Sequence, residues 1–325
     1  MPEPEKLLEI NNLTVCFETD EGTFKAVDDV SFKINRGEIV GLVGESGCGK
    51  SVTALSLLRL IPSPPGNIGK GEIFLNNTDL LRLNADSMRK IRGNAVSIIF
   101  QEPAAALSPL HRIGRQMVEA VQFHEKIDKK RAWKISEKWL KSVGIPDAGE
   151  MMFAYPFQLS GGMQQRVMIA IALMLKPDLL IADEPTTALD VTTQAQVFDL
   201  MRKMKQDQTS ILLITHDMGV VWETCDRVII MYASRIAEKG TKNDIFLKSA
   251  HPYTQGLLKS IPKLSGGSKR LTTIPGHVPS PFQYPLGCHY YDRCPHAFDR
   301  CKKEKPELAD LGNGHMTACF LALKK

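Results

Sequence analysis

The loop GESGCGKS (44–51) lies between a short apolar segment and a stretch whose apolar residues recur at helical spacing. The apolar segment EIVGLVG (38–44) is typical of a strand that is buried on both faces. The stretch SVTALSLLRLI (51–61) is typical of a helix that packs on a sheet. A strand, a Gly-rich loop and a helix in this order form the opening of an α/β nucleotide fold.

The loop fits the pattern G-x-x-x-x-G-K-[ST], whose chemistry is the cradling of phosphate groups. Glycines let backbone N–H groups turn toward anionic oxygens, and the following helix presents its positive N-terminus to them. Lys50 is expected to reach the β- and γ-phosphates, and the hydroxyl of Ser51 to bind Mg²⁺. The residues expected at the nucleotide are Gly44, Glu45, Ser46, Gly47, Cys48, Gly49, Lys50, Ser51 and Val52.

A second apolar strand, DLLIAD (178–183), ends in the acidic pair Asp183 and Glu184. In open α/β sheets ligands bind at the carboxyl ends of the strands, so both carboxylates are expected at the nucleotide. Asp183 is predicted to hold Mg²⁺ through water. Glu184 is predicted to be the general base that polarises the attacking water.

Another anion site is predicted at LSGGMQQR (159–166), where an apolar helix begins. Gly161 and Gly162 leave N–H groups open at the helix N-terminus, and Ser160 adds a hydroxyl donor. The chain already has a phosphate loop much earlier in the sequence. This second site is therefore expected to serve a nucleotide bound to a different subunit.

With these motifs the chain resembles the ATP-binding subunits of ABC transporters over roughly residues 7–255. The resemblance is carried by GESGCGKS, FQEP, LSGGMQQR, LLIADEP, TALD and LLITHD, in that order. It implies a P-loop ABC ATPase domain over 1–255, with an antiparallel β subdomain and a helical subdomain at about 104–176. It also implies a head-to-tail dimer with two ATP molecules. Each ATP would be held by the phosphate loop of one subunit and by Ser160 and Gly162 of the other.

The same resemblance implies roles for single residues. Gln101 would be the Q-loop residue, which senses Mg²⁺ and the attacking water and couples to the membrane subunits. His216 would contact the γ-phosphate and orient the water. Asp190 would lie in the D-loop, which crosses the dimer interface. Phe17 fits the aromatic residue that stacks on adenine, and an ordinary core position in a strand is an equally good interpretation.

Behind this domain we expect a Pro-, Gly- and Ser-rich linker over 256–285 and a small Cys-rich unit over 286–325. The four cysteines of this unit are Cys288, Cys294, Cys301 and Cys319. In a reducing cytosol such a cluster indicates metal more than disulfides. The gaps of five, six and seventeen residues lack the short turn of a zinc site, which favours a [4Fe-4S] cluster. Zn²⁺ and free thiols or disulfides remain alternatives.

The segments HPYTQGLL (251–258) and GCHYYDRCPHAFDRC (287–301) resemble the C-terminal extension of dipeptide and oligopeptide importers, which nickel importers share. The resemblance implies an ATPase subunit at the cytoplasmic face of the cell membrane. The implied partners are a related but distinct ATPase subunit, two membrane permeases and, indirectly, an extracytoplasmic peptide-binding protein. The region after Gln101 is the expected docking surface for a permease helix.

Composition and charge limit the other classes. The net charge of +5 gives no indication of nucleic acid as a partner. The longest apolar run, VMIAIALML (167–175), is about half of the roughly 20 residues that span a bilayer. A soluble ABC ATPase acting on nucleic acid or the ribosome is the rival hypothesis, and a metal-cofactor assembly ATPase is a third. The rival class usually has two ATPase units or a long coiled coil, which this sequence lacks.

Overall fold

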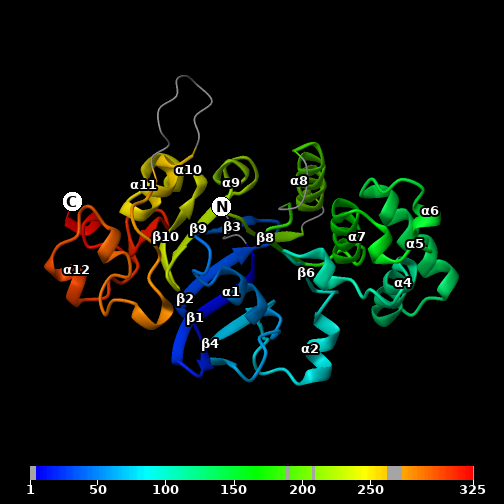
Figure 1. The fold of residues 1–325 in the computed structure, drawn as a ribbon, viewed down its shortest axis with the longest axis horizontal. Coiled ribbons are helices and arrows are strands. Elements are labelled where there is room, and N and C mark those ends of the chain that lie inside the picture. The colour runs from blue at the N-terminus through cyan, green and yellow to red at the C-terminus, as the bar shows by residue number, and fades with distance from the viewer. Residues whose placement is uncertain (1–4, 187–190, 207–208, 262–272, 325) are drawn as a thin grey trace. The chain divides into compact units, whose positions relative to one another are not determined.

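The computed structural model describes residues 5–186, 191–206, 209–261 and 273–324 (Figure 1). The chain divides into two compact units, each built from segments that are distant in sequence. The first unit comprises Met1–Leu7, Asn35–Glu38 and Arg82–Leu213, and the second comprises Leu8–Ile34, Ile39–Leu81 and Ile214–Lys325. Within the described part of the chain, we find no helix that combines the length and the apolar character needed to cross a membrane.

The first unit contains a set of strands in the order β8-β7-β6. These strands are β6 (Val96–Ile99), β7 (Leu179–Asp183) and β8 (Ser210–Ile214). Strands β6 and β7 are parallel, and every residue of β7 and β8 is buried. Burial on both faces explains why these segments read as continuous apolar runs in the sequence.

Helices make up most of the rest of the first unit. They are α2 (Ala85–Ile91), α3 (Pro103–Ala106), α4 (Ile113–His124), α5 (Lys129–Ser142), α6 (Ala148–Met151), the 3₁₀ turn η1 (Pro156–Gln158), α7 (Gly161–Leu173) and α8 (Val191–Gln206). Helix α4 buries Ile113, Met117 and Val121, which recur every four residues and so share one face. Helix α5 is capped by Asp128, the residue before it, whose side chain accepts a hydrogen bond from the backbone N–H of Arg131.

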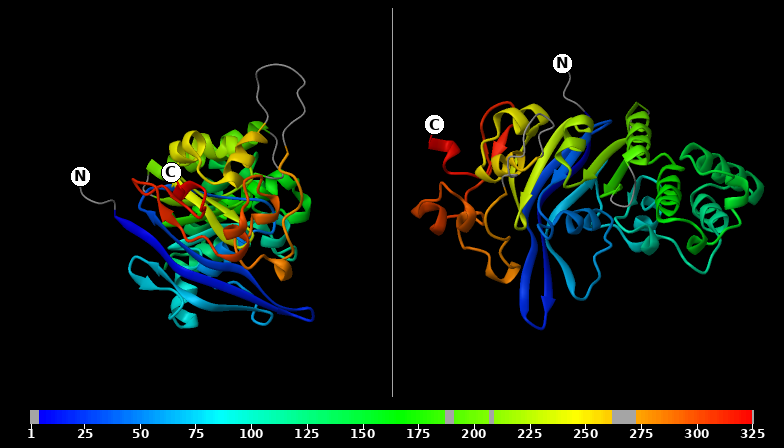
Figure 2. Two further views of the ribbon diagram at one scale, coloured as in Figure 1. Left: turned by 90° about the vertical axis from the view of Figure 1, so that its left-hand side faces the viewer. Right: turned by 45° about the horizontal axis from the view of Figure 1, so that its top comes forward.

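An antiparallel sheet opens the second unit, with the strand order β2-β1-β4-β5. Its strands are β1 (Lys6–Thr19), β2 (Gly22–Asn35), β4 (Gly66–Leu75) and β5 (Thr78–Asp79). Strands β1 and β2 form a long hairpin, blue in Figure 2, within the kind of antiparallel sheet that the resemblance implied. The turn between these two strands is formed by Asp20 and Glu21.

A second set of strands in this unit has the order β11-β12-β10-β9-β3. The strands are β3 (Ile39–Val43), β9 (Arg227–Tyr232), β10 (Arg235–Thr241), β11 (Ala309–Asp310) and β12 (Met316–Thr317). The helices are α1 (Lys50–Leu57), α9 (Met218–Thr224), α10 (Lys242–Lys248), α11 (Pro252–Lys259) and α12 (Asp299–Lys303), with 3₁₀ turns η2 (Pro281–Gln283), η3 (Tyr291–Arg293) and η4 (Ala322–Lys324). Strand β3 pairs in parallel with β9 and leads into α1.

The sequence suggested a small separate unit over residues 286–325, and the structure differs from this. These residues are called the C-terminal residues below. They belong to the second unit, because β12 pairs with β10 and adds to the edge of that strand set. Beside this pairing of β12 with β10, Nε2 of His315 lies 2.7 Å from Oε1 of Glu238, and both side chains are buried. A segment this short has too little core of its own and is stabilised by docking on a larger one. Helix α11 also runs across the predicted boundary at 255/256.

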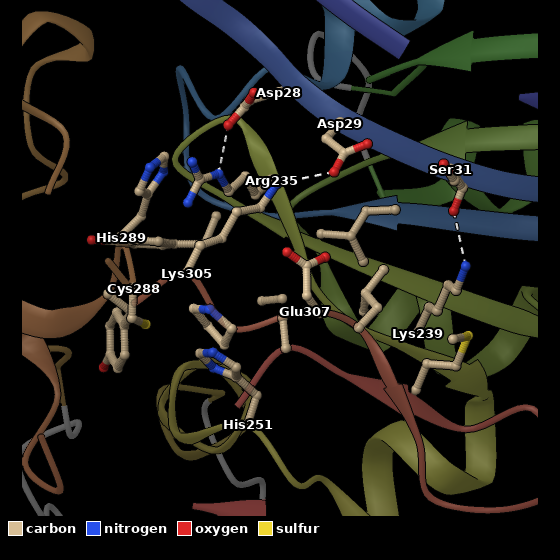
Figure 3. Close-up of a pocket in the computed structure, with 18 of the residues that line it drawn as sticks. Asp28, Asp29, Ser31, Arg235, Lys239, His251, Cys288, His289, Lys305 and Glu307 are labelled. Atoms are coloured by element: carbon tan, nitrogen blue, oxygen red, sulfur yellow. Dashed lines mark hydrogen bonds and ion pairs between the residues drawn. The ribbon is translucent and has the colours of Figure 1, made fainter. Parts of the chain in front are cut away.

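An ion pair links the C-terminal residues to β2 at a cavity of about 250 Å³ (Figure 3). Lys305 donates to Asp29 at 3.0 Å. Beside this pair, Asp28 accepts from Arg235 at 2.7 Å and from Lys25 at 2.8 Å. Burial raises the pKa of Asp28, but the bonds and charges of these two cations outweigh it and lower the pKa to about 2.

We expect Asp28→Asn to lower the free energy of unfolding by about 2 kcal/mol at pH 7. The folded pKa of about 2 lies below the ordinary 3.8, so this contribution is complete at neutral pH. It is lost as the pH falls from about 4 toward 2. Urea unfolding at pH 7 and pH 3 measures the difference. The exposed Asp86, 3.4 Å from Arg89, provides a control, since Asp86→Asn should cost less than about 0.5 kcal/mol. An equal loss for Asp28→Asn at both pH values would contradict the electrostatic role.

Candidate functional site

The predicted phosphate loop joins β3 to α1, and its glycines are required by close backbone contacts. A Cβ added at Gly44 would lie 2.2 Å from the carbonyl oxygen of Met231. One at Gly49 would lie 2.3 Å from the carbonyl oxygen of Ala26. Gly47 and Gly49 also have φ values of +77° and +104°, in the region that side-chain-bearing residues avoid. The loop can therefore be built only with glycine at these positions.

Lys50 is the first residue of α1, and its ammonium group points back into the loop. Its Nζ donates to the carbonyl oxygens of Gly44 at 2.8 Å and Glu45 at 3.0 Å. Lys50 is only 7% exposed, so a positive charge is held inside the loop. Cys48 is fully buried, and burial raises the pKa of its thiol, which therefore stays neutral. The arrangement suits a polyanionic ligand, with Lys50 as the charge and Cys48 as a spacer.

The sequence HPY at 251–253 connects to this loop, a role that sequence reasoning missed. Nδ1 of His251 accepts from the backbone N–H of Tyr253 at 3.0 Å and caps α11, and Pro252 occupies the first turn. Burial lowers the pKa of His251 to about 4, so the ring is neutral and Nδ1 can accept. The hydroxyl of Tyr253 in turn accepts from the backbone N–H of Glu45 at 3.0 Å. A histidine before a proline was a signal for this helix start.

In the first unit, β7 delivers Asp183 and Glu184 to its carboxyl end. Asp183 is buried. Glu184 has a φ of +45°, a left-handed conformation that is uncommon for a residue with a side chain and often marks functional sites. Nε2 of Gln101 donates to Oε2 of Glu184 at 3.2 Å. The structure therefore brings together two residues, 83 positions apart, that the sequence assigned to the same water.

The LSGG segment leads into α7, and its Ser160 and Gly161 are exposed at the start of the helix. Oγ of Ser160 accepts from the backbone N–H of Met163 at 3.3 Å and caps the helix, which leaves its hydroxyl hydrogen able to donate outward. A Cβ at Gly161 would meet nothing within 4 Å. Gln165 faces inward, and its Nε2 donates to the carbonyl oxygen of Pro185, just after Glu184. The helix tip thus has open donors on its outer side, in the same unit as the Gln101–Glu184 pair.

The remaining predicted contacts are placed as follows. His216, in the second unit, follows β8 and is exposed, and Asp217 caps α9 through the N–H groups of Gly219 and Val220. Phe17 is half-buried on β1 and stacks on Phe24, with ring centroids 5.7 Å apart. Asp190 lies outside the described residues.

All four clustered cysteines line one small cavity in the second unit. The residues around it include Cys288, Cys294, Cys301, Cys319, His251 and His296. Burial raises the pKa of Cys288 to about 12, and it also raises the pKa values of Cys294 and Cys319. Among the residues that the structure describes, no three His, Cys, Asp or Glu side chains are grouped closely enough to hold a metal ion. The fold therefore brings the four thiols to one cavity, without a metal-ion site among the described residues.

Two protein-family models match the chain. Residues 27–187 match the model described as "ABC transporter", and residues 237–301 match "Oligopeptide/dipeptide transporter, C-terminal region". Among solved structures, the dimeric post-hydrolysis state of the ATP-binding cassette MJ0796 bound to ADP and Pi is similar, with a TM-score of 0.66 and 28% identity. That similarity covers 73% of this chain and 99% of the other.

The similarity to named relatives extends over nearly the whole chain. The oligopeptide transport ATP-binding protein AppD of Bacillus subtilis is 50% identical over 97% of this chain and 96% of its own length. The dipeptide transport ATP-binding protein DppD of Bacillus subtilis is 47% identical, over 98% and 95%. OppD of Salmonella typhimurium is 44% identical over 98% and 95%. The chain is therefore an ATPase that belongs to the ABC transporter family, among the ATP-binding proteins of oligopeptide and dipeptide transport.

Proposed function

We propose that this chain hydrolyses ATP to drive the import of dipeptides or oligopeptides, from the cytoplasmic face of the membrane. The observation that carries this proposal is the presence of both family regions in one chain, the ATPase region and the peptide-transporter C-terminal region. The relatives reported above are named for oligopeptide or dipeptide transport, which favours peptides over nickel as cargo. The C-terminal match also disfavours a ribosomal or cofactor-assembly ATPase.

In the proposed mechanism the phosphate loop and Lys50 bind the β- and γ-phosphates of ATP. Ser51, Gln101 and Asp183 provide the hydroxyl, amide and carboxylate oxygens that suit Mg²⁺. When bound, Mg²⁺ would neutralise charge that develops on the phosphate oxygens. Glu184 accepts the proton of the attacking water, and its hydrogen bond to Gln101 supports this role by fixing the carboxylate. His216 is proposed to contact the γ-phosphate and orient the water.

A second ATPase subunit completes the site in this proposal. Ser160, Gly161 and Gly162 are proposed to bind the γ-phosphate of ATP held by that partner, and Asp190 to contribute to the interface. The open donors at the start of α7 support this assignment, because an exposed helix N-terminus with a free hydroxyl hydrogen attracts an anion. The described dimer of MJ0796 is a related case.

The permease helix is proposed to dock in a surface cavity of about 660 Å³ in the first unit. Helix α4 supplies much of its lining, including Arg115, Glu119 and Phe123. Phe123 is 55% exposed and so presents a large apolar side chain at this cavity. The cavity overlaps the region after Gln101 that the sequence assigned to permease contact. A mixed charged and aromatic lining fits an amphipathic helix.

The four cysteines are proposed to hold a [4Fe-4S] cluster with a stabilising role. The lining of one cavity by all four thiols supports a shared metal group there, and the long gaps between the cysteines in the sequence favour the cluster over Zn²⁺. Burial disfavours bare thiolates there, and a cationic metal group would compensate their charge.

We expect Glu184→Gln to lower the steady-state rate of ATP hydrolysis about 100-fold or more, because the general base is removed. Affinity for MgATP should stay within about threefold, since Glu184 acts on water and not on binding. Phosphate release and nucleotide titration measure the two quantities. Glu304→Gln, an exposed glutamate paired with Arg300, is the matched control and should leave both unchanged. Normal turnover in Glu184→Gln would remove this residue from the base role.

Phe123→Asp should reduce co-purification of the permeases about tenfold while ATP hydrolysis by the separate subunit is unchanged. The change places a charge in the proposed apolar contact. Leu247→Asp is the control, because Leu247 is 71% exposed on α10, outside the cavity. Equal permease recovery from Phe123→Asp and wild type would argue against docking at this cavity.

Anaerobic purification should give a brown protein that absorbs near 400 nm, with about four iron atoms per chain. Cys294→Ser should abolish the absorbance. Cys16→Ser should retain it, since Cys16 lies on β1 and not at the cavity. A colourless protein with one zinc per chain would replace the cluster by Zn²⁺, and a metal-free protein would leave free thiols.

A further inference from the structure

Arg293 of the C-terminal residues makes a bidentate ion pair with Glu45 of the phosphate loop. Nη1 lies 2.6 Å from Oε2 of Glu45, and Nη2 lies 3.1 Å from Oε1. The two residues are 248 positions apart in sequence and lie in the same compact unit. Paired N–H donors facing both carboxylate oxygens form the strongest and most directional arrangement available to arginine.

The guanidinium group of Arg293 is fixed on its other sides too. Nε donates to the carbonyl oxygen of Pro275 at 2.9 Å, and Nη1 also donates to the hydroxyl of Tyr232 at 3.3 Å. The Arg293 side chain is only 5% exposed, so solvent screens the pair with Glu45 weakly. Burial and several bonds together hold this cation in one position.

The backbone of Glu45 is hydrogen-bonded to α11 and to Lys50, the residue that would bind the phosphates. The backbone N–H of Glu45 donates to Tyr253, and its carbonyl oxygen accepts from Nζ of Lys50 at 3.0 Å. A movement of Glu45 would therefore displace the backbone that orients Lys50. The Glu45 carboxylate also places a negative charge beside a loop that must hold a polyanion, where like charges repel.

We propose that Arg293 is a positioning residue for ATP binding: it neutralises Glu45 and holds the phosphate loop in its binding conformation. This role rests on the proposed function only in that the loop binds ATP. The pair with Glu45 would make the C-terminal region part of the nucleotide site. Arg293 ends η3 and in the sequence lies between Cys288 and Cys294. Nothing in the spacing of the sequence motifs pointed to this residue.

The test is a double-mutant cycle in the full chain, with the affinity for a fluorescent ATP analogue and Mg²⁺ as the readout. Arg293→Met should raise Kd about tenfold, because it leaves the Glu45 carboxylate uncompensated. Adding Glu45→Gln to Arg293→Met should bring Kd back to within about threefold of wild type, since the repelling charge is gone. A merely structural role would give no such rescue. Arg300→Met is the control, as Arg300 pairs with Glu304 on the surface and should leave Kd unchanged.

The rescue decides the outcome. If the double variant binds as weakly as Arg293→Met, or if Arg293→Met binds like wild type, the proposal is overturned. Should Arg293→Met fail to fold, Arg293→Lys keeps the charge but loses the paired donors, and its Kd should rise about threefold. An unchanged Kd in Arg293→Lys would then overturn the proposal. Wild-type protein that binds no MgATP would instead refute the proposed function itself.

Discussion

The phosphate loop depends on two backbone carbonyl groups that leave no space for a side chain. The carbonyl of Met231 closes on Gly44, and that of Ala26 closes on Gly49. Met231 lies on β9 and Ala26 on β2, so the loop takes its shape from both strand sets of the second unit. Because backbone atoms cannot rotate away as side chains can, the geometry of the loop is as rigid as the strands that surround it.

One buried carboxylate organises the C-terminal half of that unit. Glu238 on β10 is fully buried and accepts from the backbone N–H groups of Ala250 and His251, at 2.7 and 3.0 Å. The same carboxylate contacts His315, so three segments meet on it. A buried carboxylate is stable only when such partners satisfy it. These contacts join the start of α11 to the terminal strands, and through Tyr253 and Arg293 the region reaches the phosphate loop.

The sequence predicted those elements whose residue types and spacing within a short stretch are characteristic of one structure. The loop at 44–51, the apolar strand at 178–183 and the helix that begins within LSGGMQQR (159–166) were all predicted from residue types and their spacing. Gln101, through the family resemblance, and Glu184, through its place at a strand end, were assigned to the same water, but their direct hydrogen bond was not predicted. The contacts of Arg293 with Glu45 and of Lys305 with Asp29 were not foreseen, because pairs of single residues far apart leave no periodic signal. For the same reason the C-terminal residues looked separate although they pack into the second unit.

The left-handed backbone at Glu184 bears on how this protein can be engineered. A carboxylate-bearing residue at a φ of +45° costs about 1 kcal/mol or more relative to glycine, for which this conformation is relaxed. A selection for heat resistance alone would therefore drift toward glycine or asparagine at this position. Because Glu184 is the proposed general base, thermostable descendants obtained in that way are expected to fold well but to hydrolyse ATP poorly, so any such screen has to use turnover as a second criterion.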